Sequence, residues 1–197
     1  MNFDVITEFE EKISNFFGSP YAIAIDSCTH GIELCLRYKS YNNISIPCHT
    51  YISIPFTLKK LNLKWSWKEE DWKNYYYLGN TNIIDAAVLW EKGSYIPNTF
   101  MCLSFQFQKH LSLGRGGMIL LDNQNDYNIL KKMSYDGREH GIPWRNQNIN
   151  TVGYHYYMTP ETATTGLQKF SEAVKTEPRK WSYHDYPYLP AMKVFNE

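Results

Sequence analysis

Apolar positions recur along the chain at two spacings, one typical of helices and one typical of strands, and the two alternate. Within residues 5–17, Ile6, Phe9 and Ile13 fall on one helical face, and Gly18 follows where a helix stop is expected. The next run, YAIAI, predicts a buried strand because it is short and apolar throughout. The same reasoning predicts further helices at about 30–38, 53–60, 126–135 and 160–175, and further strands at 44–46, 61–67, 83–84, 99–105 and 118–121.

Strands that alternate with helices predict an α/β fold, in which helices flank a central sheet. The chain of 197 residues is long enough for one domain with a proper core. We expect this domain to span residues 1–180, followed by an irregular, aromatic tail over residues 181–197. In such sheets the functional residues usually lie in loops at the strand ends, which is where we look for candidates.

Charge and hydropathy exclude several classes of function. Twenty basic residues balance twenty acidic ones, so no electrostatic surface for nucleic acid or an anionic membrane is indicated. No apolar run is long enough to span a bilayer, and MNFDVITEFEEK lacks the apolar region of a signal peptide. We therefore expect no nucleic-acid partner, no membrane span and a cytoplasmic protein.

The four cysteines and six histidines show no metal-binding spacing. Cys28, Cys35, Cys48 and Cys102 form no C-x-x-C pair. Free thiols in a reducing compartment are therefore the default interpretation. The histidines lack patterns such as H-E-x-x-H, so we expect no metal site.

The stretch SFQFQKHLSLGRGG places Lys109 in a glycine-rich loop between two predicted strands. Taken alone, such a lysine is usually a solvated surface residue. Asp85, directly after a strand, is by itself more often a helix cap than a cofactor ligand. The segment SCTHG reads as an ordinary helix start, although such a start also binds anions. Each piece by itself therefore indicates little.

Taken in order, the pieces match what a pyridoxal phosphate (PLP) enzyme requires of its protein. Such an enzyme needs a lysine amine, an acid at the pyridine nitrogen, a phosphate cradle and a flat side chain against the ring. The chain supplies Thr29 at a helix start, Tyr51 after a proline-containing turn, and Asp85 at a strand end. Ser104 and Lys109 come last. This ordered set favours a PLP site.

The same segments resemble those of the DegT/DnrJ/StrS family of PLP-dependent sugar aminotransferases. The resemblance covers about Phe9 to Gln168 and rests on FEEKISNFFGSPYAIAIDSCTHGIEL, IPCHTY, IIDAA, SFQFQKHLSLGRGGMILLD, REHG and VGYHYYMTPETATTGL. It implies a large domain of the PLP-transferase type I kind, with a mainly parallel central sheet flanked by helices. Since the sequence stops soon after the last segment, we expect the small C-terminal domain to be largely missing.

The resemblance implies roles around the cofactor ring. Lys109 would hold PLP as a Schiff base and then move a proton between substrate and cofactor. Asp85 would pair with the pyridinium nitrogen and keep it charged. Tyr51 would stack on the ring. Lys109 and Asp85 are therefore the catalytic candidates.

The resemblance also implies a phosphate site that two subunits share. Backbone amides of Cys28 and Thr29, with the Thr29 hydroxyl, would hold the phosphate at the helix start. Ser104 would add a hydroxyl. His155 stands where the family usually has an Asn that reaches the cofactor phosphate of the neighbouring subunit. The resemblance thus implies a homodimer with a shared active site.

The chain departs from the family pattern at several positions. Val88 stands where a Gln or His usually lies near the phenolic oxygen of the cofactor, and it can form no hydrogen bond. Arg115 replaces the family's Glu before the paired glycines, and Tyr157 replaces its Arg. A strand-and-helix stretch between about residues 67 and 82 is expected to be missing, because Thr29 and Lys109 lie closer together than in the family.

Three functions follow from these observations. The first is an aminotransferase that moves an amino group from an amino acid, glutamate being the expected donor, to a keto-sugar, expected to be nucleotide-linked. The second is a PLP-binding relative with other chemistry, such as dehydration. Some dehydratases of the family replace the lysine with a His, so the presence of Lys109 favours the aminotransferase. The third is a non-catalytic relative that serves in binding or assembly, which the short chain and sixteen tyrosines bring into consideration.

Overall fold

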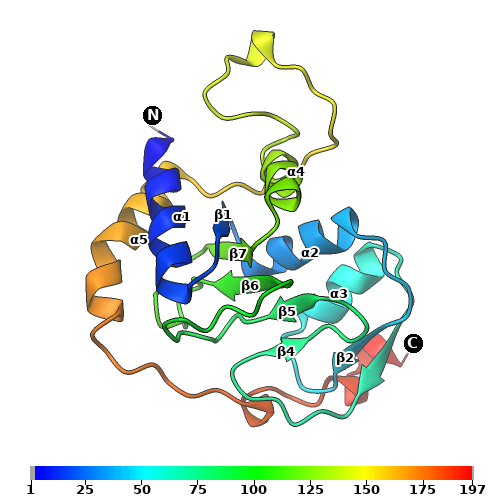
Figure 1. The fold of residues 1–197 in the computed structure, drawn as a ribbon. Coiled ribbons are helices and arrows are strands. Elements are labelled where there is room, and N and C mark those ends of the chain that lie inside the picture. Colours follow the sequence, from blue (N-terminus) through cyan, green and yellow to red (C-terminus); the bar gives the residue numbers. More distant parts are fainter. Residues whose placement is uncertain (1–2, 197) are drawn as a thin grey trace.

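The computed structural model describes residues 3–196, and within them a five-stranded sheet lies at the centre (Figure 1). Its strand order is β1-β7-β6-β5-β4. The strands are β1 (Tyr21–Ile25), β4 (Tyr76–Tyr77), β5 (Ile83–Asp85), β6 (Phe100–Ser104) and β7 (Gly117–Leu121). A separate parallel pair consists of β2 (Ile44–Pro47) and β3 (Trp65–Lys68).

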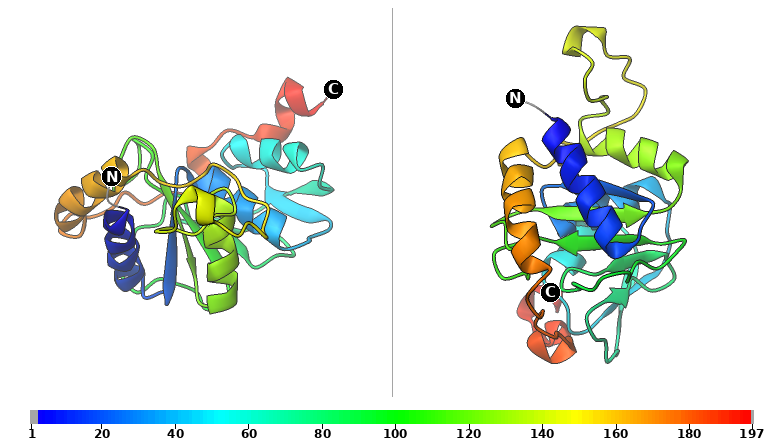
Figure 2. Two further views of the ribbon diagram at one scale, coloured as in Figure 1. Left: turned by 90° about the horizontal axis from the view of Figure 1, so that it is seen from above. Right: turned by 60° about the vertical axis from the view of Figure 1, so that its left-hand side comes forward.

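Helices cover both faces of the sheet (Figure 2). The helices are α1 (Asp4–Phe17), α2 (Cys28–Tyr38), α3 (Ser53–Lys60), α4 (Gln124–Ser134) and α5 (Pro160–Ala173). Helices α1 and α5 pack side by side on one face, and α2 and α4 lie on the other, with α3 beside α2. Short 3-10 helices occur at Trp144–Asn146, Tyr183–Asp185, Leu189–Ala191 and Lys193–Phe195. Within the described residues, no helix has the length and apolar content needed to cross a bilayer.

Each face of the sheet has its own hydrophobic core. Successive strand residues point to opposite faces, so Ile23 and Ile119 pack with α2 and α4. Their neighbours Ala24 and Met118 pack with α1 and α5. Strands β1 and β7 are therefore buried on both faces, which explains why their sequences are apolar without alternation.

The direction of the strands brings three chain segments together. Strands β5 and β6 are parallel, and β7 lies antiparallel between β6 and β1. Strands β1, β5 and β6 therefore run in the same direction, and their carboxyl ends lie at one edge of the sheet. The expected mainly parallel sheet is wrong in this detail, because the sheet is mixed. The connection over residues 105–116 contains no helix, whereas the crossover between parallel strands is usually a helix.

Most predicted elements are confirmed, and the exceptions have local causes. Helix α2 begins at Cys28 rather than near residue 30, because the Ser27 side chain caps it by accepting the N–H of His30. The predicted strand at 61–67 is wrong in its first half. Asn62 adopts a left-handed φ of 54° in the turn that follows α3, and β3 begins only at Trp65.

Two peripheral segments complete the fold. The first, which we call the arm, comprises residues 137–153 and projects from the body above α4 in Figure 1. The second, the C-terminal segment, comprises residues 178–196 and returns to the edge of the sheet. Leu189 in it is fully buried and donates its N–H to Cys48 O at 3.0 Å. The backbone N–H of Asn74 also donates to Trp181 O at 2.9 Å.

Candidate active site

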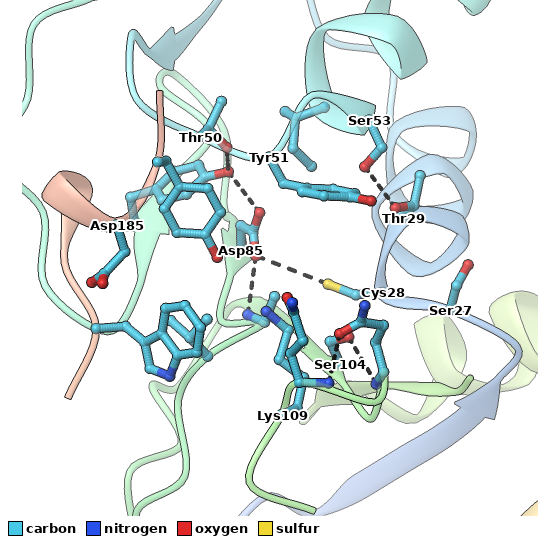
Figure 3. Close-up of a pocket in the computed structure, with 18 of the residues that line it drawn as sticks. Ser27, Cys28, Thr29, Thr50, Tyr51, Ser53, Asp85, Ser104, Lys109 and Asp185 are labelled. Carbon is cyan, nitrogen blue, oxygen red and sulfur yellow. Dashed lines mark hydrogen bonds between the residues drawn. The ribbon is translucent and has the colours of Figure 1, made fainter. Parts of the chain in front are cut away.

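A cavity of about 410 Å³ opens at the edge of the sheet where β1, β5 and β6 end (Figure 3). This volume lies within the range of small-molecule sites. Six of the seven site residues predicted from the sequence line it: Cys28, Thr29, Tyr51, Asp85, Ser104 and Lys109. The seventh, His155, lies outside it. Residues far apart in the sequence thus meet in one place.

Asp85 lies at the floor of the cavity and is 6% exposed. Its Oδ2 accepts the hydroxyl of Tyr76 at 2.6 Å, and its Oδ1 accepts the backbone N–H of Ala87 at 3.0 Å. Burial raises the pKa of Asp85, and these hydrogen bonds together with the charge of Lys109 oppose the rise. The carboxylate is therefore held in place by donors on both oxygens.

Lys109 enters the same cavity from the loop between β6 and β7. Its backbone N–H donates to Gln106 O at 2.8 Å, which folds the loop into a turn. Figure 3 shows its side chain pointing into the cavity together with Asp85. Burial lowers the pKa of Lys109, while the carboxylate of Asp85 acts in the opposite direction. Burial has the larger effect, so Lys109 loses its proton more readily than a solvated lysine. A nucleophilic amine requires this.

The start of α2 forms the polar side of the cavity. The Thr29 hydroxyl lies 2.7 Å from the hydroxyl of Ser53, the first residue of α3. The backbone N–H groups at the start of α2 add a partial positive charge there. Two hydroxyls beside a helix start form a suitable cradle for a phosphate.

Gly117 allows the loop that carries Lys109 to lie against this helix start. A Cβ atom at Gly117 would meet the backbone N of Cys28 and the carbonyl carbon of Ser27, each at 2.5 Å. The neighbouring Gly116 pairs with Ser27 as an isolated bridge. The glycines of the sequence GRGG therefore bring Lys109 and Thr29 into one cavity by letting two backbones approach closely.

The remaining predicted residues surround these groups. Tyr51 is 59% exposed and lies on the opposite side of the cavity from Lys109 (Figure 3). The Ser104 hydroxyl accepts the backbone N–H of Gln106 at 3.3 Å. Cys28 is buried, and its thiol approaches Cys102 O at 3.3 Å. Burial, followed by the nearby Asp85, raises the pKa of Cys28, so this side chain remains a neutral thiol.

His155 lies in a separate, shallower hollow of about 280 Å³. Its side chain is 73% exposed, and its Nδ1 lies 2.9 Å from Asp136 Oδ2. Tyr157 lines the same hollow. Arg115 borders both the hollow and the cavity, and its guanidinium forms a 2.7 Å ion pair with Asp26. Within one chain, His155 is therefore not brought to Lys109.

Several lining residues could not be found from sequence patterns. Trp72 and Tyr76 come from the stretch between β3 and β5, and Trp181, Asp185 and Tyr186 come from the C-terminal segment. None belongs to a motif, and the high aromatic content was the only hint. Among residues 3–196, no group of three or more His, Cys, Asp and Glu side chains is arranged to hold a metal ion.

Comparison with known families gives a clear match. A sequence model of the DegT/DnrJ/EryC1/StrS aminotransferase family matches residues 2–64 and 93–186. Lys109 lies inside the matched residues, whereas Asp85 and Tyr76 lie in the unmatched stretch between them. No curated protein sequence matches this chain.

Solved structures of similar fold carry related names. The sugar aminotransferase CalS13 from Micromonospora echinospora superposes with a TM-score of 0.73 at 13% identity, over 87% of this chain and 61% of that one. A Streptococcus pneumoniae protein described as a sugar aminotransferase, Spr1654 in its PLP form, gives 0.70 at 15% identity, over 87% and 60%. A point mutant of the GDP-4-keto-6-deoxymannose-3-dehydratase ColD, solved with bound GDP-perosamine, gives 0.70 at 14%, over 87% and 61%.

At such identities these structures show a shared fold only. The chain spans about 60% of the length of each of them. The names also cover two kinds of chemistry, transamination and dehydration, so fold alone does not choose between them.

Proposed function

Because the chain belongs to the DegT/DnrJ/EryC1/StrS aminotransferase family, we propose that it binds PLP in the cavity around Lys109 and transfers an amino group to a keto-sugar. The family indicates a PLP cofactor, and so do the structures of Spr1654, which was solved in a PLP form and in a pyridoxamine phosphate (PMP) form. The observation that carries the proposal is that Lys109, Asp85 and Thr29 line one cavity although they come from three different strand ends.

The side chains of the cavity fit PLP in their chemistry. Asp85 provides a buried carboxylate, and Lys109 provides a half-buried amine with a lowered pKa. Thr29 and Ser53 provide adjacent hydroxyls at the start of α2. A lysine, an acid and an anion cradle in one cavity are what the cofactor requires.

In the proposed reaction, PLP would supply an electron-accepting ring, and the chain would bind, orient and move protons. Thr29, Ser53 and Ser104 would hold the phosphate, and Tyr51 would cover the ring. Asp85 would keep its negative charge next to the ring nitrogen, which favours protonation of that nitrogen. The Nζ of Lys109 would attach the cofactor and later carry the proton.

The proposed substrates are an amino acid donor, glutamate, and a nucleotide-linked keto-sugar. Dehydration is the second candidate, supported by the ColD structure among those of similar fold and by Val88, an aliphatic side chain in the cavity lining. Lys109 favours transamination, because an amine at this position is both the attachment point and the proton carrier. A non-catalytic role is the third candidate, but it gives no reason for Lys109 and Asp85 to line the same cavity.

We also propose that the protein acts as a homodimer with shared active sites. Two features support this. His155 is 73% exposed and lies outside the cavity of its own chain, so its side chain is accessible to a neighbouring chain. The arm carries exposed apolar side chains, namely Ile142, Trp144, Ile149 and Val152, and such side chains mark interaction surfaces.

The protein is proposed to reside in the cytoplasm. Cys28, Cys35, Cys48 and Cys102 all lie within the described residues and carry free thiols. Unpaired cysteines are typical of reducing compartments.

Reduction with borohydride tests the proposed function. Purified protein mixed with PLP should gain visible absorbance, and borohydride should then fix the cofactor to Lys109, as peptide mass spectrometry would show. The Lys109→Arg variant keeps a cation and should not be labelled. Addition of glutamate should convert the bound cofactor to its amine form if the protein is an aminotransferase. Protein that takes up no PLP contradicts the proposal, and PLP uptake without conversion favours PLP chemistry other than transamination.

A further inference from the structure

Tyr76 and Asp85 face each other across the β4–β5 pair. The antiparallel register sets Tyr76 directly opposite Asp85, and residues in this relation carry their side chains on the same face. The hydroxyl of Tyr76 donates a hydrogen bond of 2.6 Å to Oδ2 of Asp85. The backbone pairing of β4 and β5 therefore fixes this contact, in addition to the packing of the side chains.

The hydroxyl of Tyr76 has a second partner, the hydroxyl of Thr50 in the loop after β2. An ionised carboxylate accepts hydrogen bonds only, so the single hydrogen of Tyr76 goes to Asp85 and Thr50 donates to Tyr76. Thr50 is 1% exposed and Tyr76 is 4% exposed. The three groups form a buried chain of donors that ends on the carboxylate.

We propose that Tyr76 is a positioning residue for Asp85, and that its hydroxyl keeps this carboxylate ionised and turned toward the ring nitrogen of PLP. This inference rests on the proposed function, because the ring nitrogen belongs to PLP. Tyr76 lies outside the residues that match the family model, so its role follows from this structure and not from that match.

The electrostatics of the floor of the cavity give the physical reason. Burial raises the pKa of Asp85 and so favours the neutral acid, which cannot pair with a cationic nitrogen. Within the described residues, five titratable groups face Asp85: Tyr76 from β4, Cys28 from α2, Cys102 from β6, Lys109 from the loop after β6, and Tyr186 from the C-terminal segment. Among them, Tyr76 donates the only hydrogen bond shorter than 3 Å that Asp85 accepts within the described residues.

A purely structural role for Tyr76 is the alternative. Its ring packs against Trp72, with the ring centroids 5.3 Å apart, and a buried ring of this size contributes to the core whatever its hydroxyl does. The two roles separate when the hydroxyl is removed and the ring is kept.

Tyr76→Phe makes this separation. We expect the dissociation constant for PLP to rise about tenfold, the size expected for one lost hydrogen bond to a charged acceptor. The visible absorbance of bound PLP should also change at a higher pH, because a ring nitrogen without its proton no longer opposes protonation of the linkage to Lys109. Tyr77→Phe is the matched control, since Tyr77 lies on the same strand and points to the opposite face.

A double-mutant cycle tests whether Tyr76→Phe changes PLP affinity through Asp85. In an Asp85→Asn background, Tyr76→Phe should change PLP affinity less than about twofold, because the charged acceptor is gone. Thr50→Val should also raise the dissociation constant for PLP. It serves as the second variant if thermal unfolding shows that Tyr76→Phe is poorly folded. Unchanged affinity and absorbance in these variants, with wild-type protein labelled at Lys109, overturns the positioning role alone. Wild-type protein that binds no PLP overturns the proposed function together with it.

Discussion

The Nζ atom of Lys109 lies 5.0 Å from the centroid of the Trp181 ring. The C-terminal segment thereby covers the lysine that the proposed chemistry uses. Arg179 stacks on the same ring at 3.9 Å and forms an ion pair with Asp185. The face of an aromatic ring attracts cations, so Trp181 favours the charged form of Lys109 while its bulk excludes water.

Trp181→Leu should lower the pKa of Lys109. Leucine keeps an apolar cover over the amine but removes the aromatic face, an interaction worth about 0.5–1 kcal/mol, or roughly half a pKa unit. The rate at which PLP attaches depends on the neutral amine, so its pH midpoint should move to lower pH. Stopped-flow absorbance across a pH series measures this, with Trp144→Leu on the arm as the control. A midpoint that stays constant or moves upward would contradict the role given to Trp181.

Replacing Thr29 by Val and Ser53 by Ala together should weaken the binding of PLP by about a hundredfold or more. Each hydroxyl is proposed to donate a hydrogen bond to the charged phosphate, and the loss of such a bond costs roughly 1.5–3 kcal/mol. Pyridoxal, which lacks the phosphate, should bind the double variant and the wild type about equally. Equilibrium titration of both ligands provides the comparison. An equal loss for pyridoxal would show that the cavity was damaged in general.

Gly117→Ala should destabilise the fold and weaken PLP binding together. The new Cβ meets the backbone of Ser27 and Cys28, and overpacking of this kind costs about 1–3 kcal/mol. The start of α2 must then move, and the phosphate cradle moves with it. Gly114→Ala is the comparison, because its Cβ would meet no atom within 4 Å, so it carries only the strain of a positive φ. PLP titration should separate the two variants, and urea unfolding gives the stability cost of each.

Polar substitutions on the arm should weaken self-association and leave the fold intact. Trp144 is 67% exposed and Val152 is 75% exposed, so Trp144→Ser with Val152→Ser should change the free energy of unfolding by about 0.5 kcal/mol or less. If the arm contributes to the dimer, analytical ultracentrifugation should show a larger fraction of monomer. A wild-type protein that stays monomeric at high concentration would exclude the proposed dimer.

Mixing two inactive variants tests the shared site. Lys109→Ala removes the attachment point, and His155→Ala removes the group proposed to reach the neighbour. In a mixed dimer, one cavity would combine Lys109 of one chain with His155 of the other. Tight PLP binding should therefore return in the mixture, at up to about one site per mixed dimer. The share of mixed dimers is set by mass action. Absence of any recovery in a verified mixed dimer would place His155 outside the site.

The sequence by itself determined the layered fold and the meeting of Thr29, Asp85 and Lys109 in one cavity. Its two hydrophobic periods predict which segments are helices and which are buried strands, because burial of one helix face or of a whole strand leaves a local pattern. The positions of Thr29, Asp85 and Lys109 at segment ends predicted that they would meet, since parallel strands bring their carboxyl ends to one edge.

Only the tertiary structure decided what surrounds those residues. Strand β4 has two residues, too few to show any period, so the contact between Tyr76 and Asp85 leaves no trace in the sequence. The antiparallel direction of β7 and the return of Trp181 to Lys109 depend on how the chain closes on itself. Such long-range contacts are chosen by packing of the whole molecule, and a local pattern carries no record of them.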